Sequence, residues 1–180
     1  MKKVVTLGLI AASIAVAAAC GGTEQETDLS AVDSVVDNPY GGLEVPSPTA
    51  SEPILKLVNR GQVISLSIDD LRKYPTVQVT VFEPFVKQNI EFVGVNMEDL
   101  FRAVGIEPDD LVLTVALNEY TYSNFAREFI GTEAFIAYEQ AGGPILMSRG
   151  GPLRIIVPNN TSLVESLEVW NWSLAEIRVE

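Results

Sequence analysis

The sequence predicts one folded domain of the α+β class, with a mixed or predominantly antiparallel β-sheet and a few short helices. Between residues 54 and 180, short runs rich in β-branched and aromatic residues outnumber the segments with helical periodicity. Helix-start signals occur at 67–74 and at 96–105. No internal repeat is visible. Many strands with few helices indicate an α+β domain.

The first twenty residues carry a secretory signal. Lys2 and Lys3 precede the apolar run Val4–Ala19, which ends in small residues before Cys20, the only cysteine of the chain. Residues 17–20 resemble a bacterial lipobox, which implies cleavage before Cys20 and its acylation, with palmitate among the chains. One alternative is an ordinary signal peptide with an incidental cysteine. The other is an uncleaved membrane anchor, but the apolar run is shorter than the ~20 residues that a spanning helix needs.

These features predict a signal peptide at 1–19 and an extracytoplasmic protein that is lipid-anchored to a bacterial membrane through Cys20. Residues 20–52 follow as an acidic tether. They hold several prolines and glycines and seven acidic residues, but no Lys or Arg. Such a composition buries too little apolar surface to offset the loss of chain entropy on folding, so we expect a flexible linker.

The composition of the whole chain disfavours several classes of function for the domain at 53–180. Acidic residues number 24 against 12 basic ones, which disfavours a nucleic-acid partner because such a partner requires a basic face. The chain contains no histidine, and this removes the commonest metal ligand and general base. Zinc enzymes and Ser-His-Asp hydrolases are therefore disfavoured.

The domain is predicted to begin with a strand from residue 54 that runs into a turn at 59–61 and returns as a strand at 63–66. Ser67 is the expected N-cap of a short helix that Pro75 ends. A strand at 76–82 follows, and then a loop at 84–89 and a further extended segment at 90–93.

The clearest helix is predicted at 96–105. Asn96 is the expected N-cap and Gly105 the residue after the last turn. Its apolar residues share one face. An apolar strand is expected at 111–117, either a strand or a helix at 129–138, and a final strand at 172–179 with Leu174, Ile177 and Val179 buried.

A hairpin-like unit is predicted at 144–158. It consists of 144–147, a turn at 148–152, and a buried strand at 153–157. The pair Gly150 and Gly151 permits backbone angles that other residues resist, and Arg149 and Arg154 flank it. Exposed amides beside two guanidinium groups would bind an anion. One alternative is a glycine turn with two surface arginines. In another, Arg154 pairs with a Glu or Asp on a neighbouring strand.

Several segments in this order resemble the molybdopterin-binding oxidoreductase domain, which has the sulfite-oxidase fold. The segments are Arg60–Gln62, Phe92–Val95, Asp99–Ile106, Ala116–Tyr120, Phe135–Tyr138, Gly143–Ile145, Gly150–Pro158 and Val169–Ile177. The resemblance spans nearly all of 54–180 and implies a mixed β-sheet with a few short helices.

The chain also departs from that family. The resemblance implies that catalytic members hold molybdenum through a cysteine in the loop that corresponds to 83–89, and this loop contains none. Glu83 and Thr80 are the nearest oxygen donors that could replace it. Arg149 stands near the place of a family histidine. We therefore interpret the chain as a short, single-domain member without the metal ligand.

The sequence thus predicts a non-catalytic, lipid-anchored binding domain, with no cofactor expected and a small anionic or pterin-like ligand. The ligand-binding cleft is predicted to be lined by Arg149, Gly150, Gly151, Arg154, Asn118 and Tyr120. One alternative is an oxidoreductase that uses molybdopterin with a non-thiolate metal site. Another is an interaction or sensory module for an envelope protein, with Trp170, Trp172 and Tyr122 as the aromatic contacts.

Overall fold

The computed structural model describes residues 46–158, 163 and 165–180, all within the unit Asp37–Glu180. The predicted signal peptide, Cys20 and most of the predicted tether lie outside the described residues. In the described part, no helix is long and apolar enough to span a membrane.

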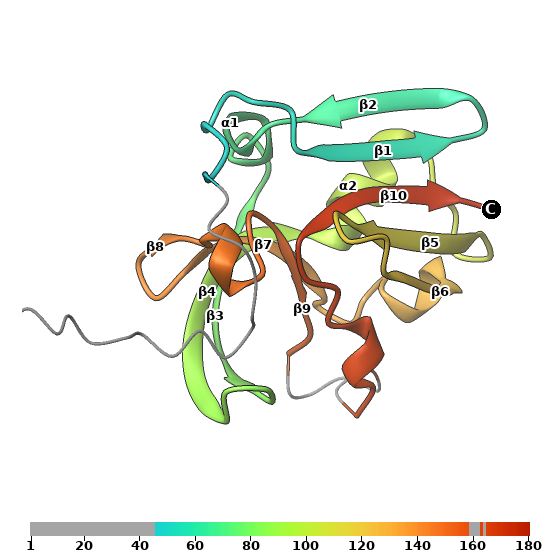
Figure 1. Ribbon diagram of the computed structural model, residues 1–180. Coiled ribbons are helices and arrows are strands. Elements are labelled where there is room, and N and C mark those ends of the chain that lie inside the picture. The colour runs from blue at the N-terminus through green and yellow to red at the C-terminus, as the bar shows by residue number, and fades with distance from the viewer. Residues whose placement is uncertain (1–45, 159–162, 164) are drawn as a thin grey trace, which may run out of the picture. The chain divides into compact units, whose positions relative to one another are not determined.

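The first of two five-stranded sheets joins the beginning of the domain to its end (Figure 1). Its strands are β1 (Leu55–Asn59), β2 (Gln62–Leu66), β5 (Leu111–Ala116), β6 (Thr121–Phe125) and β10 (Leu174–Val179). They lie in the order β2-β1-β10-β5-β6. The pair β1–β10 is parallel and the other pairs are antiparallel, so the sheet is mixed, as predicted.

The second sheet is antiparallel throughout. Its strands are β3 (Thr76–Glu83), β4 (Gln88–Asn96), β7 (Phe135–Gln140), β8 (Gly143–Pro144) and β9 (Arg154–Ile156). They follow the order β3-β4-β7-β8, and β9 also pairs with β7. Because β4 takes one edge of β7, β8 and β9 share the other edge, with β8 beside its end and β9 beside its beginning.

The predicted hairpin at 144–158 is wrong. Its two arms pair with β7 and not with each other. Between them, η3 (Met147–Arg149) forms a 3-10 turn, in which the carbonyl of Leu146 accepts bonds from the amides of Arg149 and Gly151. The apolar pattern correctly indicated buried strand residues at 153–157, but the partner strand lay elsewhere in the sequence.

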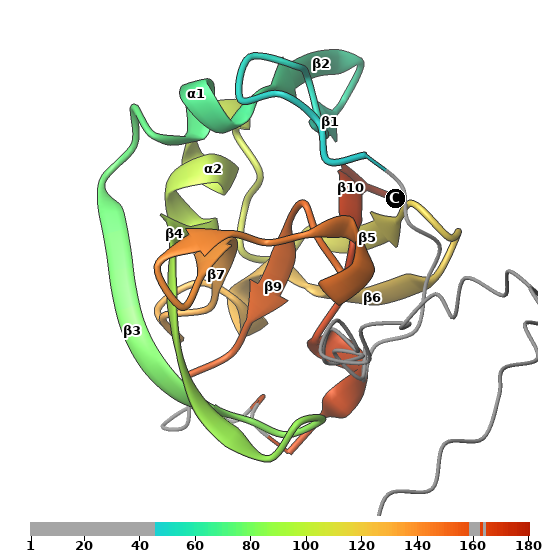
Figure 2. The same cartoon turned by 60° about the vertical axis from the view of Figure 1, so that its left-hand side comes forward.

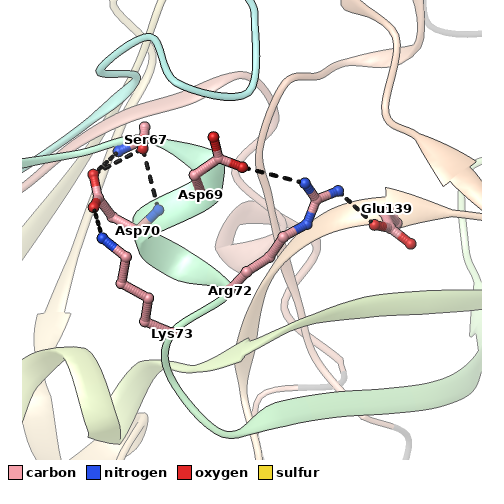
Figure 3. A network of polar contacts seen from close by, with 6 residues as sticks. All are labelled: Ser67, Asp69, Asp70, Arg72, Lys73 and Glu139. Atoms are coloured by element: carbon pink, nitrogen blue, oxygen red, sulfur yellow. Dashed lines mark hydrogen bonds and ion pairs between the residues drawn. The ribbon is translucent and has the colours of Figure 1, made fainter.

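The short helix α1 (Ile68–Leu71) begins as predicted at Ser67. The Ser67 hydroxyl accepts from the Asp70 amide, and the Asp70 carboxylate accepts from the Ser67 amide, which together form a capping box. Lys73 and these Ser67 donors lower the pKa of Asp70 well below its usual range. Beside this group, Arg72 forms ion pairs with Asp69 on α1 and with Glu139 on β7 (Figure 3).

Helix α2 (Met97–Val104) also forms as predicted. Its Asn96 side chain accepts from the Glu98 amide, and Gly105 closes the helix with a left-handed φ of 67°. The side-chain amide of Asn59, on β1, donates to the carbonyls of Val104 and Gly105 at 2.9 and 2.7 Å. One apolar face of α2 is buried, and the helix contacts β1, β4 and β7, so it packs against strands of both sheets.

Three other segments differ from the expectations. The loop predicted at 84–89 is a tight turn at 84–87, and both flanking strands are longer. The ambiguous segment 129–138 contains turns followed by the start of β7, and β6 was not predicted at all. Leu174 and Ile177 on β10 are buried as expected, whereas Val179 is only partly buried.

The segment around β9 links the two sheets and positions the region described next. The amide of Ile155 donates to the carbonyl of Asn171, and the amide of Leu174 donates to that of Leu153. The long, curved β3–β4 hairpin forms one edge of the second sheet, and its turn lies close to η4 (Leu167–Val169) in Figure 2. Three distant parts of the sequence therefore meet at one end of the domain.

Candidate ligand-binding pocket

The two predicted anion-binding glycines are packed into the fold. Their amides already donate to Met147 and Leu146 carbonyls, at 3.2 Å for Gly150 and 2.9 Å for Gly151. A Cβ on Gly150 would lie 3.1 Å from Trp172, and one on Gly151 would collide with the backbone of Ile145. Glycine is therefore required here for close packing, and neither amide is available to an anion.

Arg154 is not a surface cation but pairs with an acidic residue, which was the alternative that the sequence left open. Its side chain is fully buried, and its guanidinium lies 2.6 Å from the carboxylate of Glu83. The same guanidinium stands over the indole ring of Trp172 at 4.6 Å and over the ring of Phe92 at 5.6 Å. Its charge is thus neutralised inside the domain, which corrects its predicted place in an anion-binding cleft.

Glu83, the partner of Arg154, stands at the start of the loop where the family resemblance placed the metal ligand. One carboxylate oxygen accepts from Arg154, and the other accepts from the amides of Phe85 and Val86 at 2.9 and 2.7 Å. Thr80, the other oxygen donor considered, lies at an exposed position of β3. Both oxygens of Glu83 are therefore committed to holding the turn and the arginine.

Arg149 lies apart from this pair. It is half-buried at the end of η3, and its side chain makes no ion pair or hydrogen bond with any residue that the structure describes. The structure therefore does not bring Arg149, Arg154 and the two glycines together as one anion-binding surface. A ligand-binding role for Arg149 stays a prediction.

Asn118 and Tyr120 are the remaining two residues of the predicted ligand-binding cleft. Both line a pocket of about 330 Å³. Its other lining residues come from the β3–β4 turn and the segment that begins at η4, and they are Phe85, Leu167, Glu168, Trp170 and Trp172. The Tyr120 hydroxyl donates to the Glu168 carbonyl at 2.9 Å, which ties the β5–β6 turn to η4. The aromatic pocket, as we call these seven residues, was not foreseen as a whole.

Aromatic rings make most of the wall of the aromatic pocket. Phe85 packs edge-on against Trp172, with 4.6 Å between the ring centroids. Trp170 is only 3% exposed, so it belongs to the core and cannot be the interface anchor that the sequence suggested. Its indole N–H has no hydrogen-bond partner among the described residues. The closely spaced Trp170 and Trp172 were a visible signal of this wall, but Phe85 lies far from them in the sequence.

The charge of the aromatic pocket is negative. Glu168 is exposed and forms no ion pair in the described part of the chain, and neither Lys nor Arg is among the lining residues. Burial raises the pKa of the Tyr120 hydroxyl above its ordinary value, and the negative charge of Glu168 raises it further. The pocket therefore disfavours anions.

A second pocket, of about 420 Å³, lies where residues 46–54 meet the domain. Its lining is rich in proline and comprises Pro46, Ser47, Pro48, Glu52, Pro53, Ile54, Leu117, Met147 and Pro152. It too has no Lys or Arg among its lining residues. Neither pocket offers the positive charge expected of a cleft for a phosphate.

Residues 54–166 match the family model described as the oxidoreductase molybdopterin binding domain. The fold is similar to the crystal structure of the sulfane dehydrogenase SoxCD from Paracoccus pantotrophus, with a TM-score of 0.57 and 16% sequence identity. That similarity covers 74% of this chain but only 39% of the SoxCD chain. No curated protein matches the sequence. Together with the two sheets and short helices, these findings confirm the predicted fold.

The described residues do not fit a thiolate-held molybdenum centre. Cys20 is the only cysteine of the chain and belongs to the predicted signal and anchor. Within the described ranges, no group of three or more His, Cys, Asp or Glu side chains is placed to hold a metal ion. The carboxylate nearest to the expected ligand position, Glu83, is fully engaged. The described residues therefore offer no ligand set for a molybdenum ion.

Proposed function

The chain belongs to the oxidoreductase molybdopterin binding domain family, and we propose that it is a member that binds a ligand without redox chemistry. We also propose that a lipid anchor holds it outside the cytoplasm. The observation that carries the first proposal is the ion pair of Glu83 and Arg154. Glu83 stands at the start of the loop in which the family resemblance expects a thiolate, and the pair occupies its carboxylate. Two-electron oxygen-atom chemistry depends on the metal that such a ligand holds.

The aromatic pocket supports binding as the remaining function. Its volume lies near the lower end of the ~300–1,000 Å³ range of small-molecule sites, so it suits a small ligand. Its walls come from three separate segments that the core and the ion pair hold in place. A preformed pocket on such a scaffold binds at a low entropic cost.

The lipid anchor is proposed from the sequence. The basic residues Lys2 and Lys3, the apolar run and the small residues before Cys20 support export followed by acylation. Two acyl chains on Cys20 would hold the protein stably on the outer face of a membrane. The acidic residues up to Glu52 would then separate the domain from the lipid surface.

A second candidate is a protein that binds the pterin part of the cofactor without metal. The family match favours it, since molybdopterin is the group that the family is named for. The absence of Lys and Arg from both described pocket linings argues against it, because the phosphate of the cofactor requires positive charge. Arg149 is the predicted site residue that could still supply such a charge, since it forms no ion pair in the described part of the chain.

Elemental analysis tests the first proposal on protein purified in detergent from the membranes of its own host. We expect no stoichiometric molybdenum and no pterin fluorescence after denaturation. Stoichiometric metal would contradict the proposal. Pterin without metal would support the second candidate instead.

The anchor has its own test. Cells that express the chain should incorporate labelled palmitate into it, and Cys20→Ser should abolish this labelling. Thr23→Ser, three residues after the acylated position, is the matched control and should leave the labelling unchanged. Palmitate labelling that persists in Cys20→Ser would refute acylation at Cys20.

A further inference from the structure

We propose that the aromatic pocket is a cage for a small organic cation, with a quaternary ammonium head as its ligand. This inference rests on the proposed role of the protein as a binding domain. It names the class of ligand that the domain would bind. That ligand is a cation, whereas the sequence predicted an anion.

The first argument is the composition of the walls. Phe85, Tyr120, Trp170 and Trp172 all line the aromatic pocket, and Leu167 adds further apolar surface. The faces of aromatic rings carry negative potential, and several rings around one space bind quaternary ammonium groups. The exposed fraction of both Phe85 and Tyr120 is 41%, so these two rings are accessible to a ligand from solvent.

The second argument is charge. Glu168 supplies the carboxylate at the rim of the aromatic pocket and forms no ion pair with any described residue. The guanidinium of Arg154 lies 4.6 Å from the Trp172 ring, but its charge is compensated by Glu83 at 2.6 Å. A cation entering the pocket therefore meets an unpaired negative group and no uncompensated positive one. The net charge of −12 of the chain adds a long-range attraction in the same sense.

Choline is the simplest probe for this class of ligand, because it carries a quaternary ammonium head on a small and otherwise uncharged chain.

Calorimetric titration of the full-length protein in detergent tests the cage. The probes are choline and its uncharged isostere 3,3-dimethylbutan-1-ol, with sodium chloride at equal ionic strength in the reference cell. We expect choline to bind about 5- to 30-fold more tightly than the isostere, since a desolvated cation–π contact is worth about 1–2 kcal/mol. Equal affinities, or no choline binding, would overturn the proposal.

Glycerophosphocholine separates a free solute from a lipid headgroup as the source of the cation. Its phosphate would approach Glu168, so we expect it to bind more weakly than choline. Tighter binding of glycerophosphocholine would overturn the assignment to a free solute.

Two variants locate the binding to the aromatic pocket. Glu168→Gln should weaken choline binding about 3- to 10-fold, because one nearby charge is lost. Glu165→Gln removes a charge that is also exposed but does not line the pocket, and it is the matched control. Equal weakening by both would overturn the proposal. Phe85→Leu should weaken choline binding about 3-fold or more while leaving the isostere nearly unaffected.

The outcomes of this titration and of the metal analysis are distinguishable. Stoichiometric molybdenum would refute the proposed function whatever choline does. Metal-free protein that binds phosphate or a pterin but not choline would keep the binding function and refute the cage.

Discussion

Arg154 and Glu83 form an ion pair with 2.6 Å between their charged groups, and neither side chain is exposed to solvent. The pair joins the end of β3 to β9, two strands that are separated in the sheet by β4 and β7. Burial of two charges is costly, and the amides of Phe85 and Val86 offset part of that cost at the carboxylate. The pair thereby fixes the turn that carries Phe85 into the aromatic pocket.

Breaking this pair should strongly destabilise the domain. Arg154→Met leaves a buried carboxylate without its counter-charge, so we expect the free energy of unfolding to fall by about 3–5 kcal/mol in urea denaturation. In the double variant Glu83→Gln/Arg154→Met no buried charge remains, and the glutamine oxygen can still accept from the turn amides. We expect it to recover most of the loss.

Arg149→Met is the control for this experiment, because Arg149 makes no ion pair with a described residue. It should change the free energy of unfolding by less than about 0.5 kcal/mol. A double variant as unstable as the sum of its single changes would contradict the account of the pair.

Gly94 should not tolerate even one added methyl group. A Cβ at this position of β4 would collide with the backbone of Ile136 and Ala137 on the neighbouring strand β7. Backbone atoms cannot move aside as a side chain can, so Gly94→Ala should cost about 1–3 kcal/mol or more. Thermal unfolding measures this loss. Gly143→Ala, where the added atom meets open space, should be nearly neutral, and an equal loss at both glycines would refute the explanation.

The capping box of α1 should make the thermal stability of the domain depend on pH. Because the pKa of Asp70 is lowered in the folded state, its carboxylate stabilises the fold above its ordinary pKa of 3.8. That contribution is lost as the pH falls below 3.8 and the carboxylate becomes protonated. The difference in Tm between the wild type and Asp70→Asn should therefore be largest near neutral pH and shrink below pH 3.8.

Asp69→Asn removes the same charge from the first turn without removing a capping bond. It should lower Tm by less than Asp70→Asn at neutral pH. A Tm difference for Asp70→Asn that stays constant from pH 7 to acid would argue against the proposed role of its carboxylate.

Asn59 should be required for the end of α2. Its buried side-chain amide satisfies two carbonyls, of Val104 and Gly105, that the helix leaves without partners. Asn59→Ala should therefore cost about 1–3 kcal/mol in the free energy of unfolding, measured in urea. Asn89→Ala, at an exposed position of β4, is the comparison and should cost far less.

Local signals in the sequence predicted local structure well. Ser67 and Asn96 marked the beginnings of both α-helices because a cap is made by neighbouring residues. The polar strand β6 escaped prediction, since its residues alternate between partly buried and exposed positions and show no apolar face. Its position is set by pairing with β5.

The candidate site depended on contacts that no local pattern contains. Arg154 looked like a surface residue because its partner, Glu83, lies 71 positions earlier in the sequence. Asn118 and Tyr120 were selected through the family resemblance and do line a pocket, but the rings around them come from two other segments. Residue types indicated the fold more reliably than they indicated which side chains would meet.

The parallel pairing of β1 with β10 determines when the domain can fold. β10 lies between β1 and β5, so without residues 174–179 the first sheet would consist of two separate hairpins. The first sheet can therefore close only after β10 has been synthesised, and such long-range pairing makes folding slow. Under the export that we propose, this late closure would keep the polypeptide open while it is threaded through a membrane.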